Sequence, residues 1–267
     1  MLENKVFVVT GGGNGIGREV VLNLLNKGSK VAALDINMTA LLETQKISNK
    51  TDEEIKLYQV DITDLEKVEE TYKQIVQDFE TIDGLIHVAG IIQPFVKVVD
   101  LSYEQIVKVM KVNFYGTVYL NKTFLPMLLT KNQAYLVNVS SMGGFLPVPG
   151  QSIYGASKSA VKLLTEALYA ELKDTNVSVT AVFPGAINTN ISKNSNVSFI
   201  DKEEAAKDTK HKMLEPEKAA DLIIKAMLKK KLYSYFGTDS KLMNLIYKLA
   251  PQKAINLIAK QMKDLLK

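Results

Sequence analysis

The chain has 267 residues, 46% of them hydrophobic, which is enough for one α/β domain with a large core. It has no cysteine, which excludes disulfides and thiolate metal sites, and its two histidines, His87 and His211, are far apart in sequence, so we expect no metal. Residues 239–267 contain six lysines and two aspartates, which account for the net charge of +4 and leave 27 basic and 27 acidic residues elsewhere. A nucleic-acid-binding face is therefore not expected. Without a secretory signal or an apolar run of ~20 residues, the sequence predicts a cytoplasmic protein.

Short apolar segments alternate along the chain with longer amphipathic ones. The apolar segments predict strands at Lys5–Thr10, Lys30–Asp35, Ile55–Val60, Gly84–Val88, Ala134–Val139 and Ser178–Phe183. The amphipathic segments predict helices at Ile16–Lys27, Met38–Asn49, Asp64–Phe79, Ser102–Thr130 (with a bend) and Ser152–Thr175, with capping boxes at Thr63–Glu66 and Ser102–Gln105. This alternation indicates the α/β class and a Rossmann-type doubly wound parallel sheet. We expect one catalytic domain over residues 1–238, with a substrate lid near 186–212, and a basic amphipathic helical extension over 239–267.

A glycine-rich turn follows the first predicted strand and leads directly into a helix. Its sequence is Thr10-Gly-Gly-Gly-Asn-Gly-Ile-Gly17. Gly11, Gly15 and Gly17 permit a tight turn, close approach of the backbone to a pyrophosphate and close packing of helix on strand. The N-terminus of the helix offers free N–H groups to phosphates. Between a strand and a helix, and about 20 residues before an acidic strand end, this pattern predicts dinucleotide binding.

Asp35 is that acidic residue, at the end of the second predicted strand. Its carboxylate can accept hydrogen bonds from the adenosine ribose hydroxyls and would repel a 2′-phosphate. Asn14 and Ile36 stand at nearby positions, and Arg18 is the only arginine of the chain. Because no further arginine is available to bind a 2′-phosphate, we predict NAD rather than NADP.

A tyrosine and a lysine lie four residues apart in Tyr154-Gly-Ala-Ser-Lys158, at the start of a predicted helix. This spacing puts both side chains on one helical face, one turn apart. An ammonium group beside a phenol favours the phenolate and lowers the tyrosine pKa, so Tyr154 is a candidate proton donor and acceptor near neutral pH. The same pair is also common on helix surfaces, so the remaining motifs have to decide between the two interpretations.

Together, these motifs resemble those of the short-chain dehydrogenases/reductases over roughly residues 4–238. The motifs are Thr10-Gly-x-x-x-Gly-x-Gly17, Asn113 in Val112-Asn-Phe, Ser141 in Asn138-Val-Ser-Ser141, Tyr154-x-x-x-Lys158 and Pro184-Gly-x-x-x-Thr189. They occur in the family's order and at its spacings, including thirteen residues from the serine to the tyrosine. The resemblance implies an oxidoreductase that acts on CH–OH groups with NAD(P) and forms a homodimer or homotetramer.

The resemblance also implies a role for each catalytic residue. Tyr154 would exchange a proton with the substrate oxygen, and Ser141 would hydrogen-bond that oxygen as charge develops on it. Lys158 would lower the pKa of Tyr154 and hold the nicotinamide ribose. Asn113 would anchor a water that continues a proton relay from Lys158; alternatively, it satisfies backbone groups at a helix irregularity.

Further cofactor contacts follow from the resemblance and from the strand ends. Thr189, with backbone groups after Pro184 and Gly185, would fix the nicotinamide carboxamide. Asp61, just before Ile62, is placed either to meet the adenine amino group or to serve the turn into the next helix. The full expected set is Gly11, Asn14, Gly15, Ile16, Gly17, Asp35, Asp61, Ile62, Ala89, Gly90, Tyr154, Lys158, Pro184, Gly185, Ile187 and Thr189.

One departure from the family pattern is visible after the fourth predicted strand. Where the family usually has Asn-Asn-Ala-Gly, this chain has His87-Val-Ala-Gly90. Ala89 and Gly90 still allow close approach to the adenosine ribose, whereas the side-chain hydrogen bonds of the usual asparagines are lost or replaced. We expect His87 to make a structural hydrogen bond within the sheet.

Two apolar segments are candidates for the wall of the substrate site. They are Ile91–Phe95 and Met142–Pro149, with Ile92, Phe95, Phe145, Leu146 and Val148 as the available side chains. Since no arginine lies nearby to bind a carboxylate or phosphate, a small-molecule apolar alcohol or ketone is the expected substrate.

The extension contains two amphipathic stretches separated by Pro251. One apolar stripe consists of Leu242, Leu245, Ile246 and Leu249; a second consists of Ala254, Ile258, Met262 and Leu265, opposite Lys253, Lys260 and Lys267. We expect these stripes to pack against the body or a second subunit. The alternative is a peripheral membrane contact through residues 251–267.

The motifs are consistent with three functions. The preferred one is an NAD-dependent interconversion of an apolar alcohol with its ketone or aldehyde by hydride transfer. The second is an NADPH-dependent 3-oxoacyl thioester reductase, which Asp35 disfavours. The third is an NAD-binding sensor or scaffold without turnover, which the complete set of Ser141, Tyr154 and Lys158 disfavours.

Overall fold

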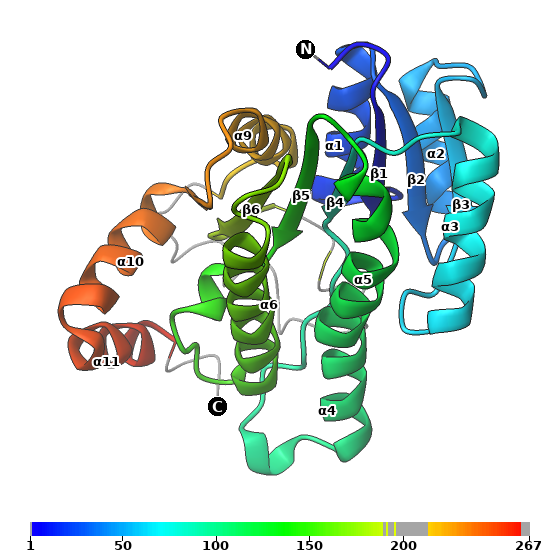
Figure 1. Ribbon diagram of the computed structural model, residues 1–267. Helices are drawn as coiled ribbons and strands as arrows, with labels where there is room; N and C mark the ends of the chain where they lie inside the picture. The colour runs from blue at the N-terminus through cyan, green and yellow to red at the C-terminus, as the bar shows by residue number, and fades with distance from the viewer. Residues whose placement is uncertain (1, 189–190, 192–194, 196–212, 263–267) are drawn as a thin grey trace.

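The computed structural model describes residues 2–188, 191, 195 and 213–262. Their backbone forms a seven-stranded sheet in the order β3-β2-β1-β4-β5-β6-β7, in which every pairing is parallel. Helices cover both faces of this sheet (Figure 1), so the predicted Rossmann-type doubly wound fold is confirmed. The strand order reverses between β1 and β4, and ligands of such sheets bind at the carboxyl ends of the strands beside this point.

The elements follow one another in regular alternation. The strands are β1 (Val6–Thr10), β2 (Lys30–Asp35), β3 (Ile55–Gln59), β4 (Gly84–His87), β5 (Ala134–Val139), β6 (Val177–Pro184) and β7 (Tyr233–Phe236). The helices are α1 (Gly15–Asn26), α2 (Met38–Ser48), α3 (Leu65–Phe79), α4 (Tyr103–Met110), α5 (Gly116–Leu129), α6 (Ser152–Glu171), α9 (Pro216–Leu228), α10 (Thr238–Leu249) and α11 (Pro251–Gln261). Three short helical segments, η1 (Val98–Asp100), η2 (Lys111–Tyr115) and η3 (Met142–Gly144), are also present among the described residues.

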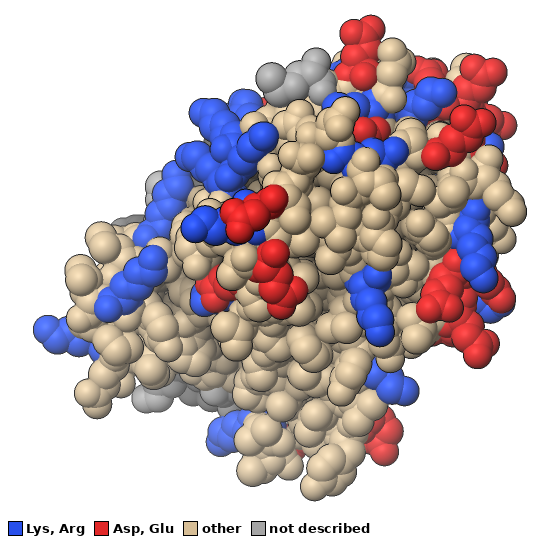
Figure 2. Space-filling view, in the orientation of Figure 1, with Lys and Arg blue, Asp and Glu red and all other residues tan. Residues whose placement is uncertain are grey.

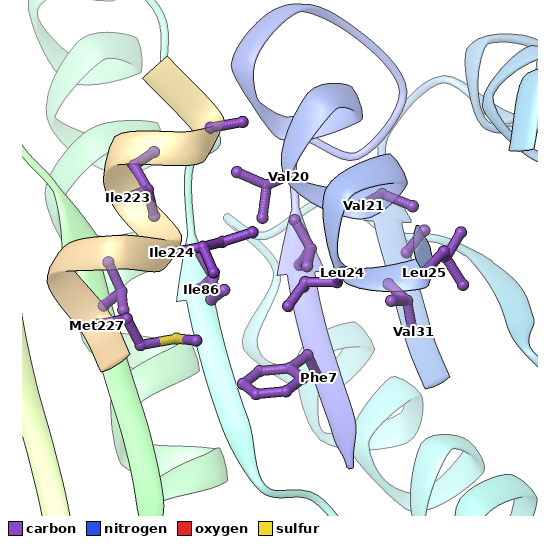
Figure 3. Close-up of a cluster of buried hydrophobic side chains, with 14 of the residues drawn as sticks. Phe7, Val20, Val21, Leu24, Leu25, Val31, Ile86, Ile223, Ile224 and Met227 are labelled. Atoms are coloured by element: carbon purple, nitrogen blue, oxygen red, sulfur yellow. The ribbon is translucent and has the colours of Figure 1, made fainter. Parts of the chain in front are cut away.

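Two apolar layers, one on each face of the sheet, form the core. On one face α9 packs against α1, and Figure 3 shows Ile224 pointing toward Val20 and Leu24. On the other face α3, α5 and α6 cover the sheet. Strands β1, β4 and β5 are buried along their whole length, and their sequences are mostly apolar instead of alternating, with Thr10, His87 and Asn138 as polar residues near the carboxyl ends.

All the predicted strands and helices are present, with small shifts at their ends. The bend expected within Ser102–Thr130 is the π-helical segment η2 between α4 and α5. The capping box at Ser102–Gln105 is confirmed, but the one at Thr63–Glu66 is wrong, because Asp64 caps α3 by accepting the N–H of Lys67 at 3.1 Å. Helix α9 and strand β7 are not among the predicted elements.

Helices α10 and α11 form an arm at the β7 end of the sheet (Figure 1). Pro251 separates them, as predicted, and is the first residue of α11. The second predicted stripe packs inward, since Ala254 and Ile258 are buried against Leu146 together with Met262. Leu265 lies outside the described residues.

The first predicted stripe is divided between two sides of α10. Ile246 packs against the body together with Met243 and Tyr247, whereas Leu242, Leu245 and Leu249 are exposed. Helix α10 therefore has two apolar faces, and packing of the outer one on a second subunit stays a prediction. Within the described ranges no helix is long and apolar enough to cross a bilayer.

Candidate active site

The glycine-rich turn between β1 and α1 has the geometry that its sequence predicts. Gly11 and Gly15 have φ angles of 70° and 52°, in the left-handed region that glycine adopts readily. A Cβ on Gly17 would lie 2.1 Å from the carbonyl oxygen of Gly11, so only glycine permits this approach of helix to strand. Asn14 caps α1 by accepting the N–H of Gly15 at 2.7 Å, and Ile16 packs partly buried on the core below.

Asp35 is fixed beside this turn at the end of β2. Its Oδ2 accepts the N–H of Gly13 at 3.0 Å, and its Oδ1 accepts the N–H of Asn37 at 3.0 Å. Arg18 holds the same turn, since its guanidinium donates to the carbonyl of Gly13 at 2.7 and 3.0 Å and pairs with Glu43 at 2.6 Å. The only arginine of the chain is thus engaged in positioning the glycine-rich turn.

His87 makes the structural hydrogen bond that the sequence predicts. Its Nδ1 lies 2.7 Å from the hydroxyl of Thr10, and this hydroxyl also accepts the N–H groups of Val88 and Ala89 at 3.1 and 3.2 Å. Because the hydroxyl already accepts two protons, it donates to Nδ1, which assigns the ring proton to Nε2. Burial, with a smaller effect of nearby Lys158, lowers the pKa of His87 to about 3. A neutral histidine therefore ties the segment after β4 to the end of β1.

Tyr154 and Lys158 lie in the first turns of α6. Lys158 is 3% exposed and donates to the carbonyl of Val139 at 3.0 Å, and burial lowers its pKa to about 8. Burial raises the pKa of Tyr154, and a hydrogen bond with Ser141 lowers it by a smaller amount. In the chain by itself, desolvation of the phenolate therefore outweighs the hydrogen bond with Ser141, and the role expected for Lys158 stays a prediction.

The two neighbouring serines after β5 have different partners. The hydroxyl of Ser141 hydrogen-bonds with the phenol of Tyr154 and accepts the N–H of Gly143 at 3.1 Å. The hydroxyl of Ser140 is buried and donates to the main-chain carbonyl of Lys158 at 2.7 Å. Ser141 is thus the serine that faces the tyrosine, while Ser140 holds α6 against β5.

Asn113 is fully buried in the π-helical segment η2. Its Oδ1 accepts the N–H of Ile91 at 2.9 Å, and its Nδ2 donates to the carbonyl of Ile91 and to the hydroxyl of Ser157, both at 2.9 Å. A Cβ on Gly90 would lie 3.0 Å from Nζ of Lys158 and 3.1 Å from Oδ1 of Asn113. Asn113, at the helix irregularity, therefore satisfies the backbone N–H and carbonyl of Ile91. Its Oδ1 and the Nζ of Lys158 also border the same space above Gly90.

Gln93 is a further residue of this site that the motifs do not indicate. It is 1% exposed, and its Oε1 accepts the N–H groups of Ile153 and Tyr154 at 2.7 and 2.9 Å. Its Nε2 donates to the carbonyl of Gly150 at 2.9 Å, and Nε2 of Gln151 donates to the carbonyl of Gln93 at 2.9 Å. Because Gln151 provides no side-chain cap to α6, Gln93 caps the helix from a distant part of the chain.

Asp61 and Ile62, both expected at the cofactor, also have contacts within the fold. Asp61 is exposed, and its Oδ1 accepts the N–H of Thr63 at 2.9 Å in the turn before α3, while its contact with the adenine stays a prediction. Ile62 is 8% exposed and packs on Gly116, where a Cβ would lie 2.9 Å from the Ile62 side chain.

The segment expected to hold the nicotinamide begins at the end of β6. Pro184 is the last residue of the strand, and a Cβ on Gly185 would lie 2.4 Å from a carboxylate oxygen of Asp239. Asp239 also accepts the N–H of Ala186 at 3.3 Å, so the start of α10 fixes this turn. Ile187 forms an isolated bridge with Leu214. Thr189 and most of the expected lid at 186–212 lie outside the described residues.

The expected substrate wall is only partly available to a ligand. Leu146 is fully buried against α10 and α11, and Phe145 packs on Phe183 and Tyr235 at ring distances of 5.8 and 5.7 Å. Leu146 belongs to the core because the arm covers it, so its assignment to the wall is wrong. Ile92, Phe95, Phe145 and Val148 are partly exposed and stay candidates.

The residues present fit a nicotinamide dinucleotide. The glycine-rich turn and the N-terminus of α1 suit a pyrophosphate, and Asp35 beside Gly13 suits a ribose diol. The absence of a Cβ at Gly90 leaves room beside Lys158. Ser141, Tyr154 and Lys158 lie together at the same edge of the sheet, so the arrangement can hold a cofactor next to a group that transfers protons.

Comparisons with known proteins agree with this geometry. The family model for short chain dehydrogenase matches residues 5–198. The chain is 32% identical to a Mycobacterium tuberculosis protein named "Putative oxidoreductase SadH" over 263 residues, which cover 96% of this chain and 95% of that protein. It is also 32% identical to an uncharacterized oxidoreductase of Staphylococcus aureus, covering 86% of this chain and 94% of the relative.

Solved structures share the fold. A short-chain dehydrogenase/reductase of Burkholderia phymatum in complex with NAD matches with a TM-score of 0.83 at 23% identity, covering 93% of this chain and 95% of that one. A short-chain dehydrogenase of Burkholderia cenocepacia in complex with NADP matches with a TM-score of 0.80 at 25% identity, covering 97% and 98%. The chain therefore belongs to the short-chain dehydrogenase family, whose members are oxidoreductases with an NAD(P)-binding Rossmann fold.

Proposed function

We propose that this protein is an NAD-linked dehydrogenase or reductase that interconverts an apolar alcohol and its ketone or aldehyde. The observation that carries the proposal is the hydrogen bond between Ser141 and Tyr154, with Lys158 one helical turn further along α6. These side chains lie at the edge of the sheet where the glycine-rich turn and Asp35 provide for a dinucleotide. A bound nicotinamide would supply the hydride acceptor or donor.

Proton transfer is the chemistry that falls to Tyr154. In the oxidising direction its phenolate would take the hydroxyl proton of the alcohol, and in the reducing direction its phenol would protonate the carbonyl oxygen. Ser141 is placed to hydrogen-bond the same oxygen while its charge changes. Since burial raises the pKa of Tyr154 in the chain by itself, oxidation requires a further contribution that favours the phenolate, and the ammonium of Lys158 is the nearby cation.

Lys158 and Asn113 would link this tyrosine to solvent. The Nζ of Lys158 and the Oδ1 of Asn113 lie next to the same point above Gly90, and a water bound between them would accept or return the proton. The lysine also faces the space that a nicotinamide ribose would occupy.

The preference for NAD is proposed from the charges at the end of β2. The carboxylate of Asp35 is held against the glycine-rich turn, where it would repel a 2′-phosphate. Arg18 is engaged with Gly13 and Glu43, so it is not available to bind that phosphate. The apolar substrate class is proposed from Ile92, Phe95 and Val148 at the mouth of the site.

A panel of apolar secondary alcohols and ketones, assayed with each of the four nicotinamide cofactors, tests the proposal. We expect turnover of at least one pair with NAD or NADH and a lower kcat/KM with the phosphorylated cofactors. Turnover of a 3-oxoacyl thioester with NADPH in preference to all of these would support the thioester reductase instead. Binding of NADH in a fluorescence titration without turnover of any substrate would support a sensor.

The Tyr154→Phe variant tests the residue that carries the mechanism. We expect turnover to fall to a small fraction of the wild-type rate while NADH still binds, because the substitution removes only the hydroxyl group that carries the exchangeable proton. Tyr58→Phe is a matched control, since Tyr58 donates to Asp78 at 2.6 Å on the far edge of the sheet and should affect stability only.

A further inference from the structure

The outer face of the α10–α11 arm carries an apolar stripe that none of the described residues covers. Leu242, Leu245 and Leu249 of α10 are 56%, 54% and 78% exposed, and they lie on one side of the helix. On the neighbouring helix, Ile255 and Leu257 are 38% and 39% exposed. Three large leucines grouped at helical spacing differ from the single exposed apolar residues that are normal on a protein surface.

Positive charge surrounds this stripe. Residues 240–262 contain Lys241, Lys248, Lys253 and Lys260 and no acidic residue, and all four lysines are exposed. Lys241 and Lys248 lie seven residues apart on α10 and flank Leu245 on the same face. In Figure 2 the outer end of the arm shows basic side chains (blue) among uncharged ones (tan).

More lysines lie beside the start of α10. Lys241 lines a surface hollow of about 380 Å³ together with Lys225, Lys229 and Lys231, and Tyr233 contributes to its wall. Within the part of the chain that the structure describes, Lys225 is the only one of these four lysines in an ion pair, at 3.9 Å from Asp221. The basic surface therefore continues from the arm onto the end of α9.

We propose that the outer face of this arm docks onto an anionic phospholipid surface. Leucines that enter the boundary between headgroups and acyl chains, with lysines at the level of the phosphates, are the arrangement by which amphipathic helices bind membranes without crossing them. A second copy of the chain is a poorer occupant, because a symmetric contact through this face would place Lys241 and Lys248 against the same lysines.

The inner side of the arm connects this face to the candidate active site. Met243, Ala254 and Ile258 pack on Leu146, in the segment that begins at Ser141. Asp239, at the start of α10, accepts the N–H of Ala186 after β6. If the proposed apolar substrate class is correct, docking would place the candidate active site near the membrane lipid, in which such a substrate dissolves. The docking itself does not rest on that class.

Vesicle flotation with the full chain tests the proposal. We expect the protein to float with vesicles of equimolar phosphatidylcholine and phosphatidylglycerol, and to stay behind with phosphatidylcholine alone. The Leu245→Ser/Leu249→Ser variant should bind the anionic vesicles at least about tenfold more weakly, because two exposed leucines lose their insertion energy. Leu42→Ser/Ile47→Ser, which changes two residues of α2 that are 53% and 47% exposed, should bind like the wild type.

A second pair of variants tests the charge. Lys241→Glu/Lys248→Glu should abolish binding, whereas Lys27→Glu/Lys173→Glu, with the same net charge and two exposed lysines elsewhere, should retain most of it. Failure of the wild type to float, or equal losses in both variants of either pair, would overturn the proposal. A leucine variant that loses an oligomer in sedimentation, with no vesicle binding by the wild type, would assign the face to a second copy. None of these readouts needs turnover, so they stand apart from the test of the enzymatic function.

Discussion

Gln93 and Tyr154 are joined by a buried hydrogen bond, in which the side-chain oxygen of Gln93 accepts the backbone N–H of Tyr154 at 2.9 Å. The two residues are 61 positions apart in the sequence. Since α6 begins without a side-chain cap of its own, the orientation of the proposed proton donor depends on the segment after β4.

The Gln93→Leu variant should therefore affect both stability and rate. Loss of one acceptor for two buried N–H groups should lower the free energy of unfolding by about 1–3 kcal/mol. A small displacement of Tyr154 should lower kcat by about tenfold or more, with a smaller change in the Kd for NADH. Denaturant titration, steady-state kinetics and NADH titration measure the three effects.

Gln105 provides a matched control for this variant. It caps α4 in the Ser102 capping box, away from the site. Gln105→Leu should destabilise the protein without a comparable loss of kcat, and Gln93→Glu, which keeps the acceptor, should restore part of the rate. Equal losses of kcat in both leucine variants would show that Gln93 has a structural role only.

The two serines after β5 should respond differently to alanine. Ser141→Ala removes the hydroxyl that faces Tyr154, and we expect kcat to fall by about 10²–10³-fold, as for other donors to a developing oxyanion. Ser140→Ala removes a hydrogen bond to the main chain of Lys158 and should cost about 1 kcal/mol of stability with most of the rate retained. Steady-state kinetics at saturating cofactor measure both, and the reverse ranking would contradict our assignment.

Cofactor preference should follow the charge at the end of β2. The Asp35→Ser/Ile36→Arg variant removes a repelling carboxylate and adds a guanidinium at a position that is 64% exposed. We expect the ratio of kcat/KM for NADP to that for NAD to rise by about a hundredfold, since each change contributes roughly 1–2 kcal/mol. Glu53→Ser, which removes an exposed acid outside the turn, should leave the ratio unchanged. A wild-type enzyme that already prefers NADP would contradict the premise.

His87 should make the stability of the protein depend on pH. Its pKa is lowered from 6.5 to about 3 in the folded state, so the unfolded chain binds the proton first as the pH falls. Stability is therefore fully present above pH 6.5 and decreases toward pH 3, by about 1.4 kcal/mol per pH unit from this residue. The His87→Asn variant should lose about 2 kcal/mol less than the wild type between about pH 7 and about pH 5 in denaturant titrations. Parallel pH profiles would mean that the histidine is not kept neutral.

The sheet and the motif residues could be predicted because their signals are local. Strands buried on both faces are mostly apolar, as in β5, and the glycine-rich turn needs glycine for reasons that the backbone alone sets. The same reasoning fails for β7, a short edge strand with the sequence Tyr-Ser-Tyr-Phe, which has no apolar run to detect.

The remaining features of the site depend on contacts between distant segments. Nothing next to Gln93 in the sequence indicates that it caps α6, because its partners come from residues 150–154. The direction in which the pKa of Tyr154 shifts likewise depends on how deeply its side chain is buried, which the spacing to Lys158 does not reveal. On α10, two apolar faces compete, and the choice between them is made by Leu146 of the body.

The π-helical segment η2 makes the length of the chain between Ser102 and Leu129 critical. One additional residue is accommodated there, since the N–H of Gly116 donates to the carbonyl of Lys111 five residues earlier. Deletion of a single residue from this segment would restore a regular helix and leave α4 and α5 in about their present orientation, because the wider turn absorbs that residue. Asn113 lies in the wider turn and would lose the position from which it binds Ile91 and Ser157. We therefore expect such a deletion to abolish activity while the fold is retained.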